Sequence, residues 1–238
     1  MTLSRLASVL AVLATLGVLG TTVAAVAAYT QRDAGAADAG PVEGAGRSHA
    51  FAGGRLVVDR GGDAAFEVPA RSRGWTTERR GVVVYYVDRS GSPAVGVEGP
   101  AVFRDGYCRR QPDSSNRGFA GFTRSVAGRD ARAANVALSR EWVRAVALDE
   151  DLRTSSPHTP LRTDEIRLAD GSTAVRSRSR IAVAGLGPCG APSVVFTMVS
   201  LDTGAGVANL VLVRDAGVPG ALSGAAADRI LGTLRARG

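Results

Sequence analysis

The sequence predicts an α+β fold, in which a long central helix and a C-terminal helix pack on an antiparallel sheet, with one membrane helix before the domain. Two strand pairs and one helical period support this fold class. Residues 166–168 and 173–183 form the first predicted hairpin, and residues 193–201 and 207–213 form the second. Residues 131–148 carry apolar side chains at helical spacing.

The connections within the two hairpins are short and contain turn-forming residues. Asp170-Gly171 lies between the first two strands, and glycine adopts the positive φ of a tight turn without steric cost. Residues 202–206 join the second pair and include glycine. The strands themselves are rich in β-branched and aromatic residues. Four consecutive strands with short loops indicate an antiparallel sheet, whose apolar face needs a covering layer.

The chain begins with an apolar segment, residues 6–29, that contains no charged side chain. Its length matches the roughly 20 apolar residues that a helix needs to cross a bilayer. Arg5 precedes it, whereas the nearest charges on its far side cancel, so the positive-inside bias places the rest of the chain outside the cytoplasm. Residues 25–27 also fit a signal-peptidase site. Residues 1–29 are therefore either the transmembrane anchor of a single-pass protein of the cell membrane or the cleaved signal peptide of a secreted protein.

Residues 30–54 consist mainly of alanine, glycine and small polar residues, with Phe51 as their only aromatic side chain. Such a composition cannot bury a core, which predicts a flexible linker. His49 lies in this linker and is expected to be solvated. Residues 55–238 then form one extracytoplasmic α+β domain, which is long enough for a single hydrophobic core.

The first half of the domain contains shorter strand patterns. Residues 55–58 and 64–68 predict an opening hairpin. Residues 81–87 form the most apolar strand of this half, which we expect at the centre of the sheet. Residues 93–98 and 101–103 predict two short strands separated by a Gly-Pro pair.

Two amphipathic helices are predicted in the domain. The apolar stripe of the first, over residues 131–148, consists of Ala134, Leu138, Trp142 and Ala145. The second helix lies near the carboxyl end of the chain, with Ser223 as its N-cap. Its apolar stripe consists of Ala227, Ile230, Leu231 and Leu234.

Several short motifs follow one another between residues 55 and 236. They are Phe66-Glu-Val-Pro69 with Gly74-Trp75, Arg117-Gly-Phe-Ala-Gly-Phe122, the alanine-rich helix with Trp142, the two cysteines, and Asp215-Ala-Gly-Val-Pro-Gly-Ala-Leu222 followed by Asp228-Arg-Ile-Leu-Gly-Thr-Leu-Arg235. In this order they resemble a family of uncharacterised actinobacterial envelope proteins, whose domain is similar to the PsbP and LpqN types. The resemblance implies a PsbP-like α/β/α sandwich and an envelope location, and it supplies no catalytic residues.

Cys108 and Cys189 are the only cysteines, and an even number in an extracytoplasmic chain favours a disulfide. We expect this disulfide to tie the sheet of the first half to that of the second. The cysteines and histidines lack the paired spacing of a metal site, so no metal is expected. Residues 185–190 match GxGxxG, but prolines and a strand pattern follow where a helix is required. No cofactor is therefore expected.

The chain carries a formal net charge of +7, and all 29 of its basic residues are arginines. Without lysine it has neither a Schiff-base amine nor a phosphate-loop lysine. Arg176, Arg178 and Arg180 alternate with serines, so a strand places this arginine row on one face. The row either binds the phosphates of an anionic polymer or lipid or is simply solvated. Nucleic acid is not an expected partner, because the domain is outside the cell and shows no aromatic stacking face.

The sequence does not identify a function. We expect a non-catalytic binding or interaction module of the bacterial cell envelope, attached to the membrane by its N-terminal helix, with an unknown envelope protein or cell-wall component as its partner. One alternative is a secreted hydrolase using His158 with Ser155 or Ser156, although no glycine-flanked serine elbow supports it. Another is a binder of anionic polymer or lipid through the arginine row.

Overall fold

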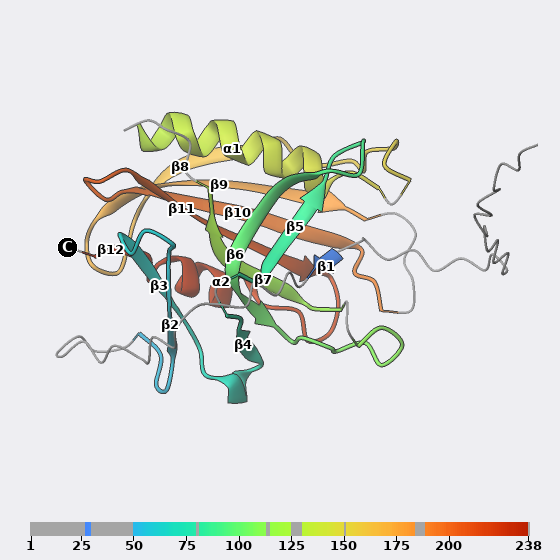
Figure 1. The fold of residues 1–238 in the computed structure, drawn as a ribbon, viewed down its shortest axis with the longest axis horizontal. Helices are drawn as coiled ribbons and strands as arrows, with labels where there is room; N and C mark the ends of the chain where they lie inside the picture. The colour runs from blue at the N-terminus through green and yellow to red at the C-terminus, as the bar shows by residue number, and fades with distance from the viewer. Residues whose placement is uncertain are drawn as a thin grey trace, which may run out of the picture.

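The computed structural model describes residues 27–29, 50–79, 81–112, 115–124, 130–149, 151–183 and 189–237. This part of the chain forms two antiparallel sheets and two α-helices (Figure 1), which confirms the predicted α+β class. The larger sheet has the strand order β1-β5-β6-β7-β11-β10-β9-β8, with β4 paired to β6 outside this path. The smaller sheet has the order β12-β3-β2.

The larger sheet comprises β1 (Ala27–Tyr29), β4 (Trp75–Thr77), β5 (Val83–Val87), β6 (Pro93–Phe103), β7 (Gly118–Thr123), β8 (Arg162–Arg167), β9 (Thr173–Ala182), β10 (Ser193–Asp202) and β11 (Val207–Ala216). The smaller sheet comprises β2 (Arg55–Val58), β3 (Ala64–Val68) and β12 (Arg235–Ala236). The helices are α1 (Ala131–Val146) and α2 (Gly224–Leu231), and the short 3₁₀ helix η1 (Arg71–Arg73) precedes β4.

The two predicted hairpins are confirmed as the meander β8–β11, in which each strand pairs with the next. Strands β10 and β11 pair without interruption from Ser193–Ala216 to Asp202–Val207. Side chains alternate between the faces of a strand, so this register assigns every residue of the meander to one of two faces.

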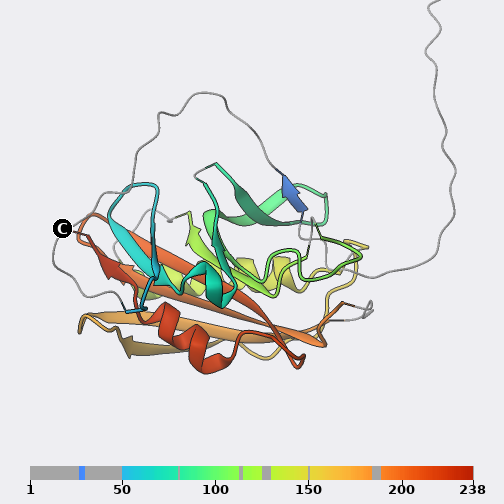
Figure 2. The same ribbon diagram turned by 90° about the horizontal axis from the view of Figure 1, so that it is seen from below.

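Both faces of the larger sheet are covered. Val211 and Val213 of β11 belong to a core cluster with Leu138 and Trp142 of α1. Leu210, on the opposite face of β11, belongs to a second cluster that includes α2 and the smaller sheet. Helices α1 and α2 accordingly lie on opposite sides of the meander (Figures 1 and 2). The helices therefore pack on the sheet as predicted, and β2 and β3 share the layer of α2.

Helix α1 begins and packs as its sequence predicts. Its N-cap Asp130 accepts hydrogen bonds from the amides of Arg132 and Ala133. Trp142 is fully buried, and its ring stacks on Phe196 of β10 with centroids 6.0 Å apart. The helix ends at Val146, two residues earlier than predicted.

The C-terminal helix α2 also begins at its predicted cap, because the Ser223 hydroxyl accepts a hydrogen bond from the amide of Ala226. It ends at Leu231, so Leu234 is buried beyond the helix rather than within it. Thr233 follows the helix and accepts a hydrogen bond from the amide of Glu67 at 2.7 Å. This contact brings the chain back to β3, where β12 pairs.

Two strand predictions for the first half are corrected. Strand β5 is not central: it lies between β1 and β6 at one end of the larger sheet and is mostly half-buried. Strand β6 is one strand of 11 residues rather than two, because the Gly-Pro pair is accommodated as an irregularity in its register with β7 between Glu98 and Ala101. The predicted opening hairpin forms as β2 and β3, but it belongs to the smaller sheet.

Strand β7 has no counterpart among the predicted strands. Its two phenylalanines are three positions apart among glycine and alanine, so the sequence lacks the alternation of a strand pattern. Gly121 is needed there because a Cβ at this position would lie 2.9 Å from the Cβ of Val97 on β6. Close approach of the two backbones thus selects a residue of low strand propensity.

Most of the predicted membrane segment and linker lies outside the described residues, as do His49 and residues 185–188 of the glycine motif. Residues Ala27–Tyr29, the last three of the predicted membrane helix, instead form β1 and pair with β5. Neither α-helix of the described chain is long and apolar enough to cross a membrane. Ala50, at the end of the predicted linker, donates its amide to the buried carboxylate of Glu67 at 2.8 Å.

The predicted disulfide is present and joins Cys108 to Cys189, with their Cα atoms 5.9 Å apart. Cys108 lies in the connection between β6 and β7, and Cys189 lies in that between β9 and β10. The expectation that it would tie together two separate sheets is corrected, because β6, β7, β9 and β10 belong to one sheet. The bond instead connects two loops of this sheet.

Replacing both cysteines by serine should lower the free energy of unfolding by about 4–5 kcal/mol. The bond spans a sequence separation of 81 residues, and the chain-entropy model assigns roughly this value to a closed loop of that length. Urea titration of the wild-type and double-variant proteins measures the difference. Wild-type protein in a reducing agent is the matched control and should behave as the variant does. A loss below about 1 kcal/mol in both would contradict the prediction.

Candidate functional site

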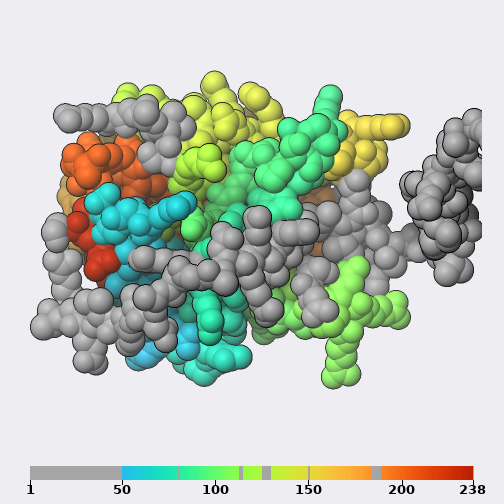
Figure 3. All heavy atoms as spheres, in the orientation of Figure 1, coloured from blue at the N-terminus to red at the C-terminus, as the bar shows by residue number. Residues whose placement is uncertain are grey.

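A cleft of about 1250 Å³ opens between β2, the start of β6, α1 and the start of β11. It forms because the larger sheet splits at this place. Strand β6 pairs with β7 only from Val97 onward, so the residues before Val97 pair with β5 alone. The β2–β3 hairpin, the β5–β6 hairpin and α1 appear on one face of the molecule (Figure 3).

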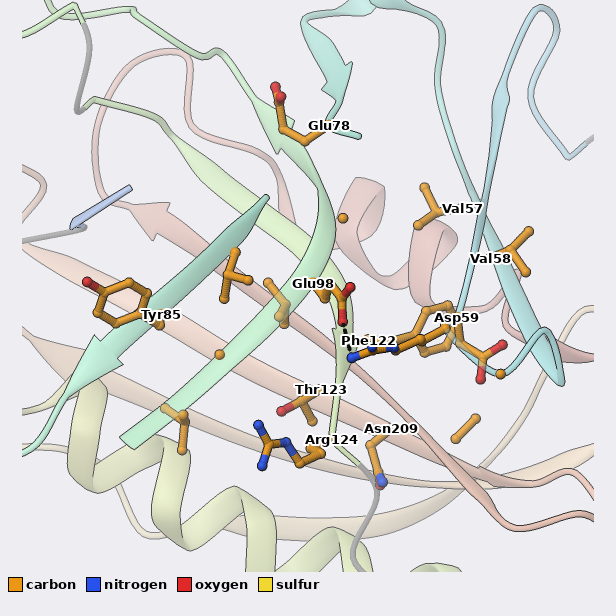
Figure 4. Close-up of a pocket in the computed structure, with 18 of the residues that line it drawn as sticks. Val57, Val58, Asp59, Glu78, Tyr85, Glu98, Phe122, Thr123, Arg124 and Asn209 are labelled. Carbon is orange, nitrogen blue, oxygen red and sulfur yellow. Dashed lines mark ion pairs between the residues drawn. The ribbon is translucent and has the colours of Figure 1, made fainter. Parts of the chain in front are cut away.

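The cleft has an apolar base and a polar wall. Phe122 and Val97 are buried core residues that contribute to the lining, and so does Leu138 of α1. In the view of Figure 4, Tyr85 of β5 lies on the left, and Phe122 of β7 and Asn209 of β11 lie to its right. An aromatic ring, an amide and apolar side chains around one concavity are typical of a ligand site.

The charge of the lining is opposite to that of the chain. Four carboxylates contribute to it, those of Asp59, Glu78, Glu98 and Glu141, together with two arginines, Arg60 and Arg124. Arg60 already forms an ion pair with Glu98 at 3.6 Å (dashed in Figure 4). The described lining is therefore locally acidic within a protein of net charge +7.

A buried hydrogen-bond network and one partly buried hydrogen bond hold the wall of the cleft. The Asn135 amide of α1 donates to the Ser200 hydroxyl at 2.9 Å, and this hydroxyl donates to Oδ1 of Asn209 at 2.6 Å. The indole of Trp142 donates to the Thr123 hydroxyl at 3.4 Å. The buried face of α1 holds the helix in place. Through these hydrogen bonds the helix in turn holds Asn209 and Thr123 of the lining.

The arginine row predicted from the sequence lies on the α2 side of β9 and is largely paired. Arg176 forms a two-point ion pair with Asp164, with its shorter contact at 2.6 Å. Arg178 forms an ion pair with Asp228 of α2. Arg180 is exposed and donates to the Ser193 hydroxyl at 2.9 Å. The three side chains share a face, but they are not three equivalent free cations.

The residues of the hydrolase alternative have other partners. Nδ1 of His158 lies 3.1 Å from the carbonyl oxygen of Thr159, and the side chain is exposed. Ser156 is buried and its hydroxyl donates to Asp149 at 2.6 Å. In the described chain, no hydrogen bond joins His158 to Ser155 or Ser156. The hydroxyl–imidazole contact that activates a nucleophile is therefore not formed here.

A polar cluster beside the disulfide has no counterpart in the sequence predictions. Arg117 and Asp215 form an ion pair at 2.8 Å, with side chains only 12% and 16% exposed. The Arg117 guanidinium also lies 3.9 Å from the ring centroid of Tyr107, whose hydroxyl donates to the carbonyl of Cys189. Burial raises the pKa of Asp215, and the hydrogen bond and charge of Arg117 oppose this rise. The residues of this polar cluster come from segments that are distant in the sequence, so no local sequence pattern could reveal the cluster.

No group of three or more His, Cys, Asp or Glu side chains in the described residues is arranged to hold a metal ion. Residues 47–238 match the family model described as "Domain of unknown function (DUF8017)". No curated protein and no solved structure shows a significant match to the chain.

Replacing Arg117 with methionine should lower the free energy of unfolding by about 3–5 kcal/mol at neutral pH, because it leaves the Asp215 carboxylate buried without its cation. A raised pKa means that the folded state binds a proton more readily than the unfolded state does. Stability therefore falls as the pH rises from about 4 toward the folded pKa. The variant loses the contacts that lower this pKa, so its stability should fall over a wider pH range.

Urea titrations across the acidic and neutral range measure this dependence. The double variant Arg117→Met with Asp215→Asn is the matched control and should recover part of the loss, since no buried charge remains. If the single variant is destabilised equally at all pH values, the buried charge of Asp215 is not the cause of the loss.

Proposed function

The chain belongs to the DUF8017 family, whose function is unknown, and we propose that it is a non-catalytic, extracytoplasmic binding module whose ligand occupies the cleft beside β6. The observation that carries the proposal is the cleft itself. Its volume of about 1250 Å³ exceeds the 300–1,000 Å³ typical of pockets for small ligands, which fits an extended ligand.

The lining favours a neutral or cationic ligand. Its carboxylates outnumber its arginines, and one arginine is already occupied by Glu98. Carboxylates accept hydrogen bonds from the hydroxyl and N–H groups of a ligand. The ring of Tyr85 offers an apolar surface with a polar tip. A polyhydroxylated polymer with amide N–H groups matches these groups, and the glycan strands of peptidoglycan are a cell-wall component of this kind.

The proposed location rests on the N-terminal segment and on the sequence resemblance. The apolar residues 6–29 and the preceding Arg5 support export, either with retention as a single membrane anchor or with cleavage and secretion. The motifs between residues 55 and 236 resemble those of actinobacterial envelope proteins with PsbP- or LpqN-like domains. The layers of the domain, with α1 and α2 on opposite faces of a sheet, are compatible with such a sandwich.

The binding role is favoured over hydrolysis because Ser156 and His158 have separate hydrogen-bond partners. A direct test is hydrolysis of peptidoglycan and of ester substrates by the wild-type and His158→Ala proteins. Any hydrolytic activity that the substitution abolishes would contradict the non-catalytic role.

Replacing Glu98 with glutamine should weaken binding to purified peptidoglycan, measured by co-sedimentation of the full-length chain. The expected loss is on the order of tenfold, because a hydrogen bond to a charged group contributes about 1.5–3 kcal/mol. Glu165→Gln is the matched control: Glu165 also has one arginine partner, Arg132 at 3.3 Å, but it lies on β8 and not in the cleft. Equal effects of the two substitutions, or no binding by the wild type, would exclude the cleft as this ligand's site.

A further inference from the structure

Three arginines converge on the α2 side of the meander. Arg180 of β9 and Arg214 of β11 are both aligned with Val195 of the intervening strand β10. They share a face and are separated by two strand spacings, which is roughly 10 Å. Arg178 lies on the same face, two residues before Arg180. We call Arg178, Arg180 and Arg214 the arginine cluster.

The cluster has more positive than negative charge. Its nearby carboxylate is Asp228, which forms an ion pair with Arg178 and also lies 3.8 Å from Arg176. In the described chain, neither Arg180 nor Arg214 has a carboxylate within ion-pair distance. Arg214 instead donates to the backbone carbonyl oxygens of Leu222 at 2.9 Å and Asp215 at 3.4 Å.

The arginines are close enough to disfavour one another's charge. Burial lowers the pKa of Arg214, and the charges of Arg178 and Arg180 lower it further. Nε of Arg178 is buried and has no hydrogen-bond partner in the described structure. Like charges held together with an unused donor are stabilised when an anion binds between them.

We propose that the arginine cluster binds a phosphate group of a phosphodiester ligand. Guanidinium groups match the oxygens of phosphate in paired hydrogen bonds, and Arg180 is exposed and free of a carboxylate to begin such a contact. Asp228 competes with the ligand for Arg178. None of the three arginines lines the cleft, so this site is separate from the proposed peptidoglycan site.

This site differs from the arginine row predicted from the sequence. Arg176 is excluded because Asp164 already contacts it at two points, and Arg214 replaces it from a strand 34–38 positions further along the chain. The same phosphodiester chemistry occurs in phospholipid headgroups and in phosphate-linked cell-wall polymers. The experiment therefore includes one probe for each source.

Binding of glycerophosphoglycerol, a small phosphodiester, to the full-length chain in non-ionic detergent is measured by isothermal titration at low ionic strength. Arg180→Gln should weaken binding about fivefold, the effect of losing one arginine contact with an anionic surface. Asp228→Asn should strengthen it by a similar factor of about five, because it releases Arg178. Arg140→Gln, which removes an exposed arginine on α1, is the control and should leave the affinity unchanged.

Opposite effects at Arg180 and Asp228, with no effect at Arg140, support the proposal. Equal losses from Arg180→Gln and Arg140→Gln, or the absence of saturable binding, overturn it. Poly(glycerol phosphate) and short-chain phosphatidylglycerol then distinguish the sources: tighter binding of one of them through Arg180 identifies that class. If glycerol 3-phosphate, a monoester, binds but glycerophosphoglycerol does not, the assignment to a phosphodiester is wrong.

Discussion

Burial of both faces of the strands β10 and β11 is the constraint on which the rest of the fold depends. Phe196 and Met198 of β10 point to the α1 side, whereas Leu210 and Leu212 of β11 point to the α2 side, and all four are buried. Each such side chain stabilises the fold by about 1.5–3 kcal/mol only when it is covered. If only one face of the sheet were covered, one of these two pairs of side chains would be exposed to water. The chain must therefore supply a covering layer on each face.

The cleft follows from how these layers are supplied. Trp142 packs α1 against one face of the larger sheet. On the other face, Phe66 of β3 packs edge-on against Phe122 of β7, with ring centroids 5.4 Å apart. The start of β6 extends beyond the end of β7 and pairs with β5 alone. Among the described residues, the gap between this extension and β11 is lined by carboxylates from several segments. The site is therefore a consequence of the sheet's splitting and not of one local motif.

The sequence predicted those parts of the fold whose signals are local. The meander has turn residues between periodic strands, and the predicted cap Ser223 accepts a hydrogen bond from the neighbouring amide of Ala226. It did not predict β7, because contact between Gly121 and Val97 of β6 selects glycine, nor the assignment of β2 and β3 to a second sheet. The contact between Arg117 and Asp215 spans 98 residues, and that between Arg178 and Asp228 spans 50. Such pairs have no periodic signature, so sequence reasoning found the row of arginines but not which of them are already neutralised.

The distribution of charge supports two separate binding surfaces. Arginines outnumber carboxylates by 29 to 22 in the whole chain, so a surface that merely reflected composition would be basic everywhere. The lining of the cleft is acidic, whereas the arginine cluster carries excess positive charge because its nearby carboxylate, Asp228, is shared between Arg176 and Arg178. Holding like charges together lowers stability unless a partner of opposite charge is present. The acidic lining of the cleft therefore disfavours a phosphate-bearing ligand, so the two proposed ligands would not compete for one surface.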